Sequence, residues 1–192
     1  MTATAPSRVP AGATADGDGI LVGRGPVRVD LYIDFLCPFC KRFELSSGET
    51  LASLAADGRA SLAYHPMNFL DQASTTNYST RATAASGCAA DQGRFVEYAH
   101  ALFVGQPHEG GPGLSDAELV DLAAVAGLAE KEFAACVADG PYLDWPSYVT
   151  ARASQAGVGG TPTVLVAGAD VSPEPDAIAA AVAQAARQQG LG

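Results

Sequence analysis

The chain lacks any run of apolar residues long enough for a membrane-spanning helix, which needs about 20 of them. It is also poor in positive charge, with 11 Lys and Arg against 21 Asp and Glu and a formal net charge of −10. Lys41 and Arg42 are the only adjacent basic residues. Because nucleic acids and anionic membrane surfaces attract clustered basic residues, we expect no nucleic-acid partner.

The N-terminal segment lacks the basic start and the apolar run of a secretory leader. It reads MTATAPSRVPAGATADGDG and is rich in Ala, Thr, Gly and Pro. This composition is typical of disorder, so we predict a disordered arm at residues 1–18. The sequence as it stands therefore predicts a cytoplasmic protein, or an exported one if a leader has been removed.

Metal-binding spacing is absent as well. The four cysteines comprise one C-x-x-C pair, Cys37 and Cys40, and two isolated residues, Cys88 and Cys136, and the three histidines show no paired spacing. Structural zinc usually takes two close pairs, or one close pair with two histidines. We therefore predict no metal and no cofactor. The C-x-x-C pair is then either a redox dithiol or two inert buried thiols.

What is present is enough apolar sequence for one domain with one insertion, 48% of 192 residues. Between residues 27 and 35, Val, Leu, Ile and Phe alternate with Arg, Asp and Tyr, which predicts a strand that leads directly to Cys37. We expect further strands at residues 19–22, 60–69 and 161–168.

Helical patterns occupy most of the remainder. A helix should follow Pro38, with an interruption at residues 46–50, and a helical block should span residues 70–156. Ser115 and Glu118 have the spacing of a capping box at a helix start. Ser172 and Pro173 are the expected start of the last helix.

The position of Cys37, between a strand and a helix, has chemical consequences. The first N–H groups of a helix have no partner within it and carry partial positive charge. A thiolate placed there is stabilised, so its pKa falls and it becomes nucleophilic near neutral pH. Pro38 is tolerated at the first helical position, and Cys40 lies one turn on, within disulfide reach. This arrangement favours thiol–disulfide exchange.

The combination of CPFC after a strand, a helical block, and a Gly-rich turn into Thr161-Pro162 resembles the DsbA-like branch of the thioredoxin superfamily. The segments QGRFVEYAHALF (92–103) and GVGGTPTVLVAG (157–168) are similar to family patterns too. The resemblance implies an α/β thioredoxin fold, with a central mixed sheet flanked by helices. It divides the chain into a thioredoxin-like domain, residues 19–69 and 157–192, and an inserted helical domain, residues 70–156.

The resemblance also implies roles for the residues at the site. Cys37 is the attacking thiol and Cys40 the resolving one. Pro162 follows a cis peptide bond and lies opposite the dithiol, which leaves the backbone of Thr161 free to pair with an extended substrate. Pro38 and Phe39 belong to the same substrate-binding site.

Three further expectations concern neighbouring positions. We expect Met67 to join Phe39 on an apolar substrate rim. Cys88 and Cys136 lie on apolar helical faces, and by packing alone they are buried free thiols. The resemblance implies instead a structural disulfide between them, at odds with a cytoplasmic protein.

The sequence departs from family patterns at two positions. Leu31 stands six residues before Cys37, where many thioredoxins carry a buried acid, so proton transfer would fall to water or Asp34. Phe39 stands between the cysteines, where oxidising members often carry His. Both departures leave the direction of electron flow open.

The resulting prediction is a monomeric thiol–disulfide oxidoreductase that acts on protein thiols and disulfides. We expect it to be an oxidant rather than a reductant, on the resemblance, and to be recycled by a partner protein. The alternatives are a disulfide reductase or isomerase, and a thioredoxin-fold binding or chaperone module without redox turnover.

Overall fold

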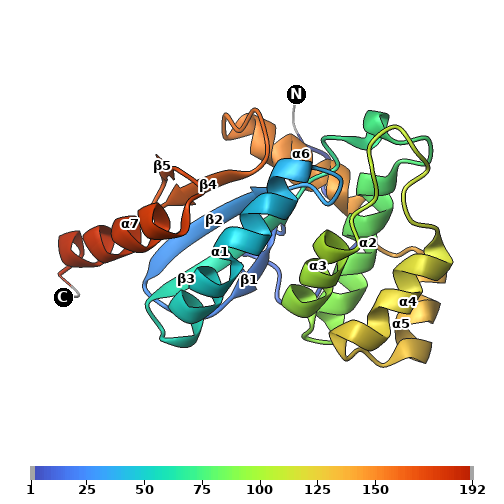
Figure 1. Ribbon diagram of the computed structural model, residues 1–192, viewed down its shortest axis with the longest axis horizontal. Coiled ribbons are helices and arrows are strands. Elements are labelled where there is room, and N and C mark those ends of the chain that lie inside the picture. Colours follow the sequence, from blue (N-terminus) through green and yellow to red (C-terminus); the bar gives the residue numbers. More distant parts are fainter. Residues whose placement is uncertain (1–2, 191–192) are drawn as a thin grey trace.

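The computed structural model describes residues 3–190, and Figure 1 shows the course of the chain. Its centre is a five-stranded sheet of order β1-β3-β2-β4-β5. β2 and β3 are parallel, whereas the other neighbouring strands are antiparallel. The strands are β1 (Ile20–Val22), β2 (Val27–Ile33), β3 (Ala60–Pro66), β4 (Thr163–Val166) and β5 (Ala169–Val171).

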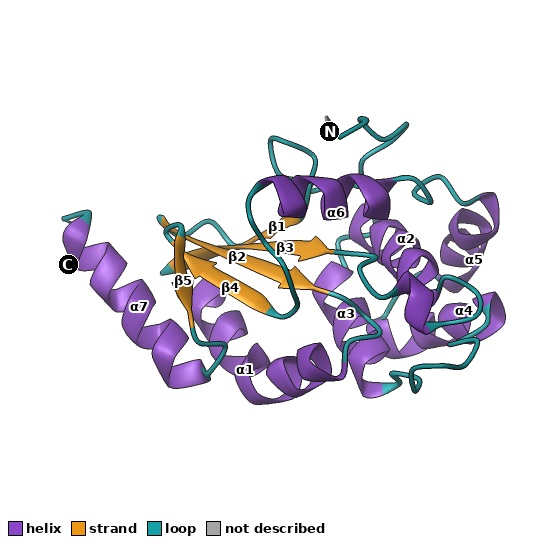
Figure 2. Ribbon diagram, turned by 90° about the horizontal axis from the view of Figure 1, so that it is seen from above, coloured by secondary structure: helices purple, strands orange, loops and turns teal. Residues whose placement is uncertain are grey.

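Helices cover both faces of this sheet. Figure 2 shows α1 and α7 on one face and α6 on the other, with α2–α5 gathered beside the sheet. The α/β fold with a helical region, α2–α6, is therefore confirmed, while the boundary residues of the inserted domain remain a prediction. The helices are α1 (Pro38–Ala56), α2 (Tyr78–Asp91), α3 (Phe95–Val104), α4 (Asp116–Ala126), α5 (Glu130–Asp139), α6 (Trp145–Gln155) and α7 (Pro175–Gln188), with a short 3₁₀ turn, η1 (Asp71–Ala73).

β2 is the central strand that leads to the dithiol. Its alternate residues Val27, Val29, Leu31 and Ile33 are all buried, as the sequence pattern predicts. The strand ends at Ile33 rather than at residue 35, because the chain turns at Asp34. There the carboxylate accepts the N–H of Leu36 at 2.8 Å, which closes a local turn.

Two predictions about helices are wrong, one about an interruption in α1 and one about the start of α7. α1 runs without interruption through residues 46–50, and α7 begins at Pro175, after an extended Glu174, rather than at Ser172. The buried Ser47 donates its hydroxyl to the carbonyl of Pro173 at 2.8 Å. This contact joins the middle of α1 to the chain before α7. No local sequence pattern predicts it, because the two residues are 126 positions apart.

The capping box at the start of α4 is confirmed. The Ser115 hydroxyl accepts the N–H of Glu118, and the Glu118 carboxylate accepts the N–H of Ser115 at 2.8 Å. Gly127 ends the helix in the left-handed region, with φ +69°, which glycine adopts without steric cost. Local sequence alone determines both ends of this helix.

The N-terminal arm predicted at residues 1–18 is described from residue 3 onward, and this part makes tertiary contacts. Residues 3–18 lie against the helical region and the sheet. The N–H of Ser7 donates to Asp144 at 2.7 Å, and the buried indole of Trp145 donates to the carbonyl of Gly17 at 2.8 Å. The composition of the arm gives it little apolar surface to bury. Hydrogen bonds to Asp144 and Trp145 connect it to the rest of the protein.

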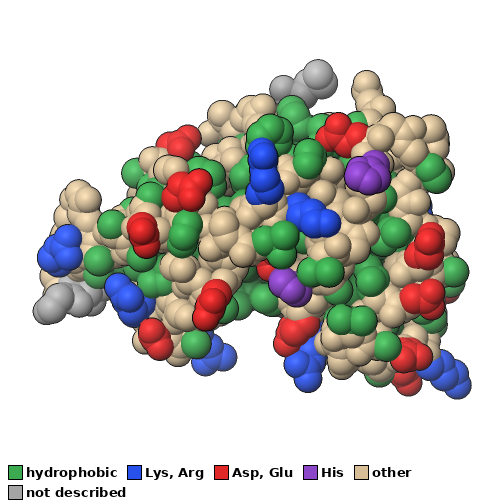
Figure 3. Space-filling model, in the orientation of Figure 1, with side chains coloured by type: hydrophobic (Ala, Val, Ile, Leu, Met, Phe, Trp, Pro, Cys, Tyr) green, Lys and Arg blue, Asp and Glu red, His purple; other side chains and the backbone are tan. Residues whose placement is uncertain are grey.

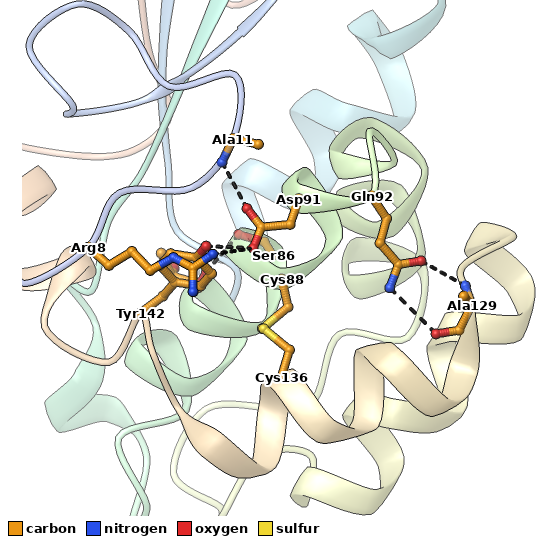
Figure 4. Close-up of a disulfide and its surroundings, with 10 residues drawn as sticks. Arg8, Ala11, Ser86, Cys88, Asp91, Gln92, Ala129, Cys136 and Tyr142 are labelled. Carbon is orange, nitrogen blue, oxygen red and sulfur yellow. Dashed lines mark hydrogen bonds and ion pairs between the residues drawn. A yellow bond between two sulfur atoms is a disulfide. The ribbon is translucent and has the colours of Figure 1, made fainter.

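A disulfide joins Cys88 of α2 to Cys136 of α5, with the two Cα atoms 5.9 Å apart (Figure 4). It therefore crosslinks two helices of the same region. No helix within residues 3–190 is long and apolar enough to cross a membrane.

Candidate active site

The dithiol lies at the junction of β2 and α1. Cys37 is the N-cap residue of α1, with extended backbone angles, and Pro38 takes the first helical position. Cys40 follows one turn later. Both thiols are free, and both are shielded, with exposed fractions of 4% for Cys37 and 0% for Cys40. The pair therefore lies at the start of a helix that follows a strand, as the strand pattern and Pro38 predict.

The segment that faces the dithiol comes from far along the chain. The peptide bond between Thr161 and Pro162 is cis and directly precedes β4. β4 pairs antiparallel with β2 in a register that sets Thr163 opposite Tyr32. This pairing brings the start of β4 to the end of β2, and the Cys37 thiol donates to the carbonyl of Thr161 at 3.3 Å.

The two thiols have opposite electrostatic environments. The pKa of Cys37 is lowered to about 6, first by a hydrogen bond with the Cys40 thiol and further by hydrogen bonds with the side chain of Thr161 and with the first backbone N–H groups of α1. Burial opposes this shift. The pKa of Cys40 is raised well above its ordinary value, chiefly by burial. One thiol is therefore ionised near neutral pH while the other keeps its proton.

Asp34 is the acidic group beside this pair. Its side chain is fully buried and accepts three hydrogen bonds, from the N–H groups of Leu36 and Leu70 and from the hydroxyl of Ser79 at 2.6 Å. Burial is the main reason why its pKa is raised to about 6. Leu31 is buried and apolar. The buried acid therefore stands three positions before Cys37 rather than six.

A groove of about 660 Å³ lies next to the dithiol. Phe39 is 59% exposed there, and the guanidinium of Arg42 lies 4.4 Å from the centre of its ring. Figure 3 shows basic side chains over the start of α1, near the middle of this face, and acidic ones mainly around its periphery. The groove is lined by Phe39, Arg42, Phe43, Ser46, Thr161, Pro162, Pro173 and Glu174.

The structure changes two expectations about nearby residues. Met67 is fully buried and lies beneath the surface, so its placement on the substrate rim is wrong. Gln106, which sequence reasoning missed, donates its side-chain amide to the carbonyls of Phe35 at 2.9 Å and Cys37 at 3.0 Å. Gln106 lies in an irregular loop without periodicity, so no sequence signal identifies it.

Residues 3–190 contain no group of three or more His, Cys, Asp or Glu side chains placed to hold a metal ion. The functional groups brought together at this site are two thiols, a cis-proline loop and a buried carboxylate.

Comparison with known proteins identifies this class of site. The thioredoxin family profile matches residues 18–184. Reduced DsbA from Mycobacterium tuberculosis has a similar structure, with a TM-score of 0.76 and 33% identity over 87% of this chain and 91% of that one. The reduced disulfide bond oxidoreductase DsbG of the same organism also has a TM-score of 0.76, with 34% identity over 88% of this chain and 87% of that one.

The chain therefore belongs to the thioredoxin family. Within that family it is a DsbA-like thiol–disulfide oxidoreductase, with its C-x-x-C motif at Cys37 and Cys40.

A further relative is the serine/threonine-protein kinase PknE of M. tuberculosis, which is 36% identical over 160 residues. That match takes in 77% of this chain but only 28% of the kinase. The chain thus spans little more than a quarter of the kinase's length.

Proposed function

We propose that the protein oxidises thiols of protein substrates, with Cys37 as the exchanging sulfur and Cys40 as the resolving one. The observation that carries this proposal is that the two thiols of the pair have pKa values shifted in opposite directions. Cys37 lies at a helix N-terminus against the carbonyl of Thr161, with its pKa lowered, whereas Cys40 is buried with its pKa raised. Thiol–disulfide exchange needs one sulfur that ionises readily and a second that resolves the intermediate.

In the oxidising direction the cycle begins with a disulfide between Cys37 and Cys40. A substrate thiolate attacks the sulfur of Cys37, and the sulfur of Cys40 leaves and takes up a proton. A second substrate thiolate then attacks the substrate sulfur of the mixed disulfide, and Cys37 leaves as a thiolate. The substrate dithiol loses two electrons and two protons and becomes a disulfide, while the enzyme is reduced to its dithiol.

The lowered pKa of Cys37 favours this direction. A thiolate that is stabilised in the reduced enzyme is a good leaving group, and it makes the enzyme disulfide more oxidising. The pKa of about 6 lies between the values typical of thioredoxin, about 7, and of strongly oxidising DsbA, about 3.5.

The surroundings of the dithiol suit protein substrates. The groove beside Phe39 presents apolar side chains, and the cis-proline loop offers backbone groups to an extended segment. Unfolded chains supply both apolar side chains and free backbone, so we propose that cysteines in unfolded or partly folded chains are the substrates. A separate redox partner must reoxidise the dithiol after each cycle.

Two measurements test this function. Equilibration with glutathione buffers, with the state of Cys37 and Cys40 read by alkylation and mass, gives the potential; a value at or below that of thioredoxin would rule out the oxidant. A Cys40→Ser variant should trap a mixed disulfide between Cys37 and a dithiol peptide. The absence of that adduct, in a folded variant, would rule out exchange through Cys37.

The structural disulfide bears on the compartment. Disulfides persist in oxidising environments and are rare where cytosolic reductants act. The bond between Cys88 and Cys136 therefore supports an oxidising compartment over the cytoplasm. An oxidant of protein thiols would work in the same kind of environment.

The similarity to PknE supports a second candidate, a binding or sensing module. In that kinase the related segment is one part of a longer protein. A module of this kind would bind its partner whether or not its dithiol turns over. Partner binding that survives Cys37→Ser, together with no exchange by the wild-type protein, would favour this candidate over the enzyme.

A further inference from the structure

Two side chains connect the loop that carries Cys37 to the helical region. We call residues 34–37 the dithiol loop. At its start, the carboxylate of Asp34 accepts the hydroxyl of Ser79, in the first turn of α2. At its end, the amide of Gln106, in the loop after α3, donates to the carbonyl of Cys37 at 3.0 Å. The dithiol loop is thus held at both ends by side chains of the helical region, one from α2 and one from the loop after α3.

The Asp34 contact is a buried anchor. One carboxylate oxygen accepts the N–H of Leu36 and the hydroxyl of Ser79, and the other accepts the N–H of Leu70 at 2.9 Å. These donors come from the dithiol loop, α2 and the segment after β3. With three acceptor positions occupied, the side chain is built to hold these segments together rather than to swing toward a thiol and shuttle a proton.

The Gln106 contact acts on the backbone of the N-cap residue itself. The carbonyl of Cys37 already accepts the first helical hydrogen bond of α1, from the N–H of Lys41 at 3.2 Å. Gln106 adds a second donor to that oxygen, and with the same nitrogen it bonds to the carbonyl of Phe35. The amide therefore fixes the orientation of the backbone on both sides of Leu36, and with it the direction of the Cys37 side chain.

We propose that Asp34 and Gln106 are positioning residues through which the helical region controls the ionisation of Cys37. The proposal rests on the proposed function, because it assigns to the helical region a role in tuning the same dithiol. The two residues act with opposite sign. The Asp34 carboxylate is a like charge that opposes the Cys37 thiolate, whereas Gln106 holds Cys37 where the α1 N–H groups stabilise it.

The other titratable groups near Cys37 differ from Asp34 in burial or in the partners they bind. On α1, Cys40 keeps its proton, the ammonium of Lys41 donates to the carbonyl of Val104 at 3.1 Å, and Arg42 stacks on the ring of Phe39. Across the groove stands Glu174, and beside Asp34 lies the buried phenol of Tyr78, whose pKa is raised by burial. Asp34 is the one fully buried carboxylate among them in residues 3–190.

The test compares Asp34→Asn and Gln106→Ala with a matched control, Gln92→Ala. Gln92 lies in the same helical region and also bonds through its amide to a backbone, that of Ala129, in the surroundings of the Cys88–Cys136 disulfide (Figure 4). Each reduced variant is pulsed with iodoacetamide across a pH series. Mass spectrometry of the peptide that contains Cys37 gives the pH midpoint of its ionisation, and a thermal melt gives stability.

We expect the midpoint to fall by about one pH unit in Asp34→Asn, because a like charge is removed, and to rise by about half a unit in Gln106→Ala. Gln92→Ala should lower the melting temperature without moving the midpoint. Unchanged midpoints in both test variants, with lowered stability, would show a merely structural role and overturn the proposal. A shift in Gln92→Ala equal to that in Gln106→Ala would overturn it as well.

A second variant serves if Asp34→Asn does not fold. Ser79→Ala keeps the carboxylate but removes one hydrogen bond that favours its ionised form. The carboxylate then keeps its proton to higher pH, so the Cys37 midpoint should fall by less than in Asp34→Asn; no fall would contradict the proposal. Alkylation reads the thiol directly, so these results hold even if exchange with protein substrates is not found.

Discussion

The two pairs of cysteines in this protein could each form a disulfide, but they lie in different structural environments. Cys37 and Cys40 lie one helical turn apart at the start of α1, and both are free. Cys88 and Cys136 are 48 residues apart, on two packed helices, and are bonded to each other. The first pair has one ionised and one protonated thiol, which suits repeated exchange. The second crosslinks a helical layer and has no stabilised thiolate. Placement, rather than residue type, separates a reactive pair from a structural one.

The largest expected effect comes from removing the reactive member of the first pair. Cys37→Ser should abolish oxidation of a dithiol peptide, because no other described thiol is both free and ionised near neutral pH. A stopped-flow fluorescence assay measures this loss. Circular dichroism should show an unchanged fold, and residual turnover above the uncatalysed rate would contradict the assignment.

Removing the second pair should affect stability instead. For a bond that closes a 48-residue separation, the chain-entropy model gives a loss of about 4 kcal/mol in the free energy of unfolding. Urea unfolding of a Cys88→Ala and Cys136→Ala double variant measures it. Oxidation activity should persist at temperatures where this variant is folded; a loss of activity in the folded state would break the separation between the two pairs.

A smaller effect is expected from pH. A thiol with a pKa of about 6 is mostly protonated at pH 5 and mostly ionised at pH 7, so alkylation of Cys37 should become about tenfold faster over this range. Cys40 should remain unreactive throughout, since burial raises its pKa. A Cys37 rate that keeps rising steeply above pH 8 would show an ordinary thiol.

The smallest expected effect concerns the residue between the reactive cysteines. Phe39→His places a group that can carry positive charge beside the Cys37 thiolate, where the exposed ring now stacks with Arg42. The Cys37 midpoint should fall by about half a pH unit, which is roughly a threefold faster alkylation at pH 5. Phe39→Leu is the control. If both substitutions shift the midpoint equally, the change reflects the lost ring rather than the added charge.

Sequence patterns predicted the parts of this fold that depend on neighbours in the chain. The alternation in β2, the position of Cys37 before Pro38 and the capping box at Ser115 all follow from residues within a few positions of one another. The same reasoning failed where distant segments meet. Ser47 lies in a stretch that looked like a helix break, yet its hydroxyl bonds to Pro173, 126 residues away.

The candidate site shows the same division. The C-x-x-C spacing identifies the dithiol, and a resemblance was needed to connect it with Pro162. Gln106 acts through an amide that contacts backbone carbonyls, and such contacts leave no periodicity or spacing in the sequence. Asp34 was visible as an acid near Cys37, but two of its three donors, Leu70 and Ser79, come from segments that follow β3.

The pairing of β2 with β4 has a consequence for the order of events in folding. The hydrogen bond from Cys37 to Thr161 spans 124 residues, and it forms only after β4 has joined the sheet. Contacts of such long sequence separation are slow to form, because the intervening chain must first be ordered. The side-chain hydrogen bond with Thr161, which helps to lower the pKa of Cys37, likewise requires β4 to be in place. The low pKa of Cys37 is therefore a property of the assembled sheet and not of the C-x-x-C segment alone.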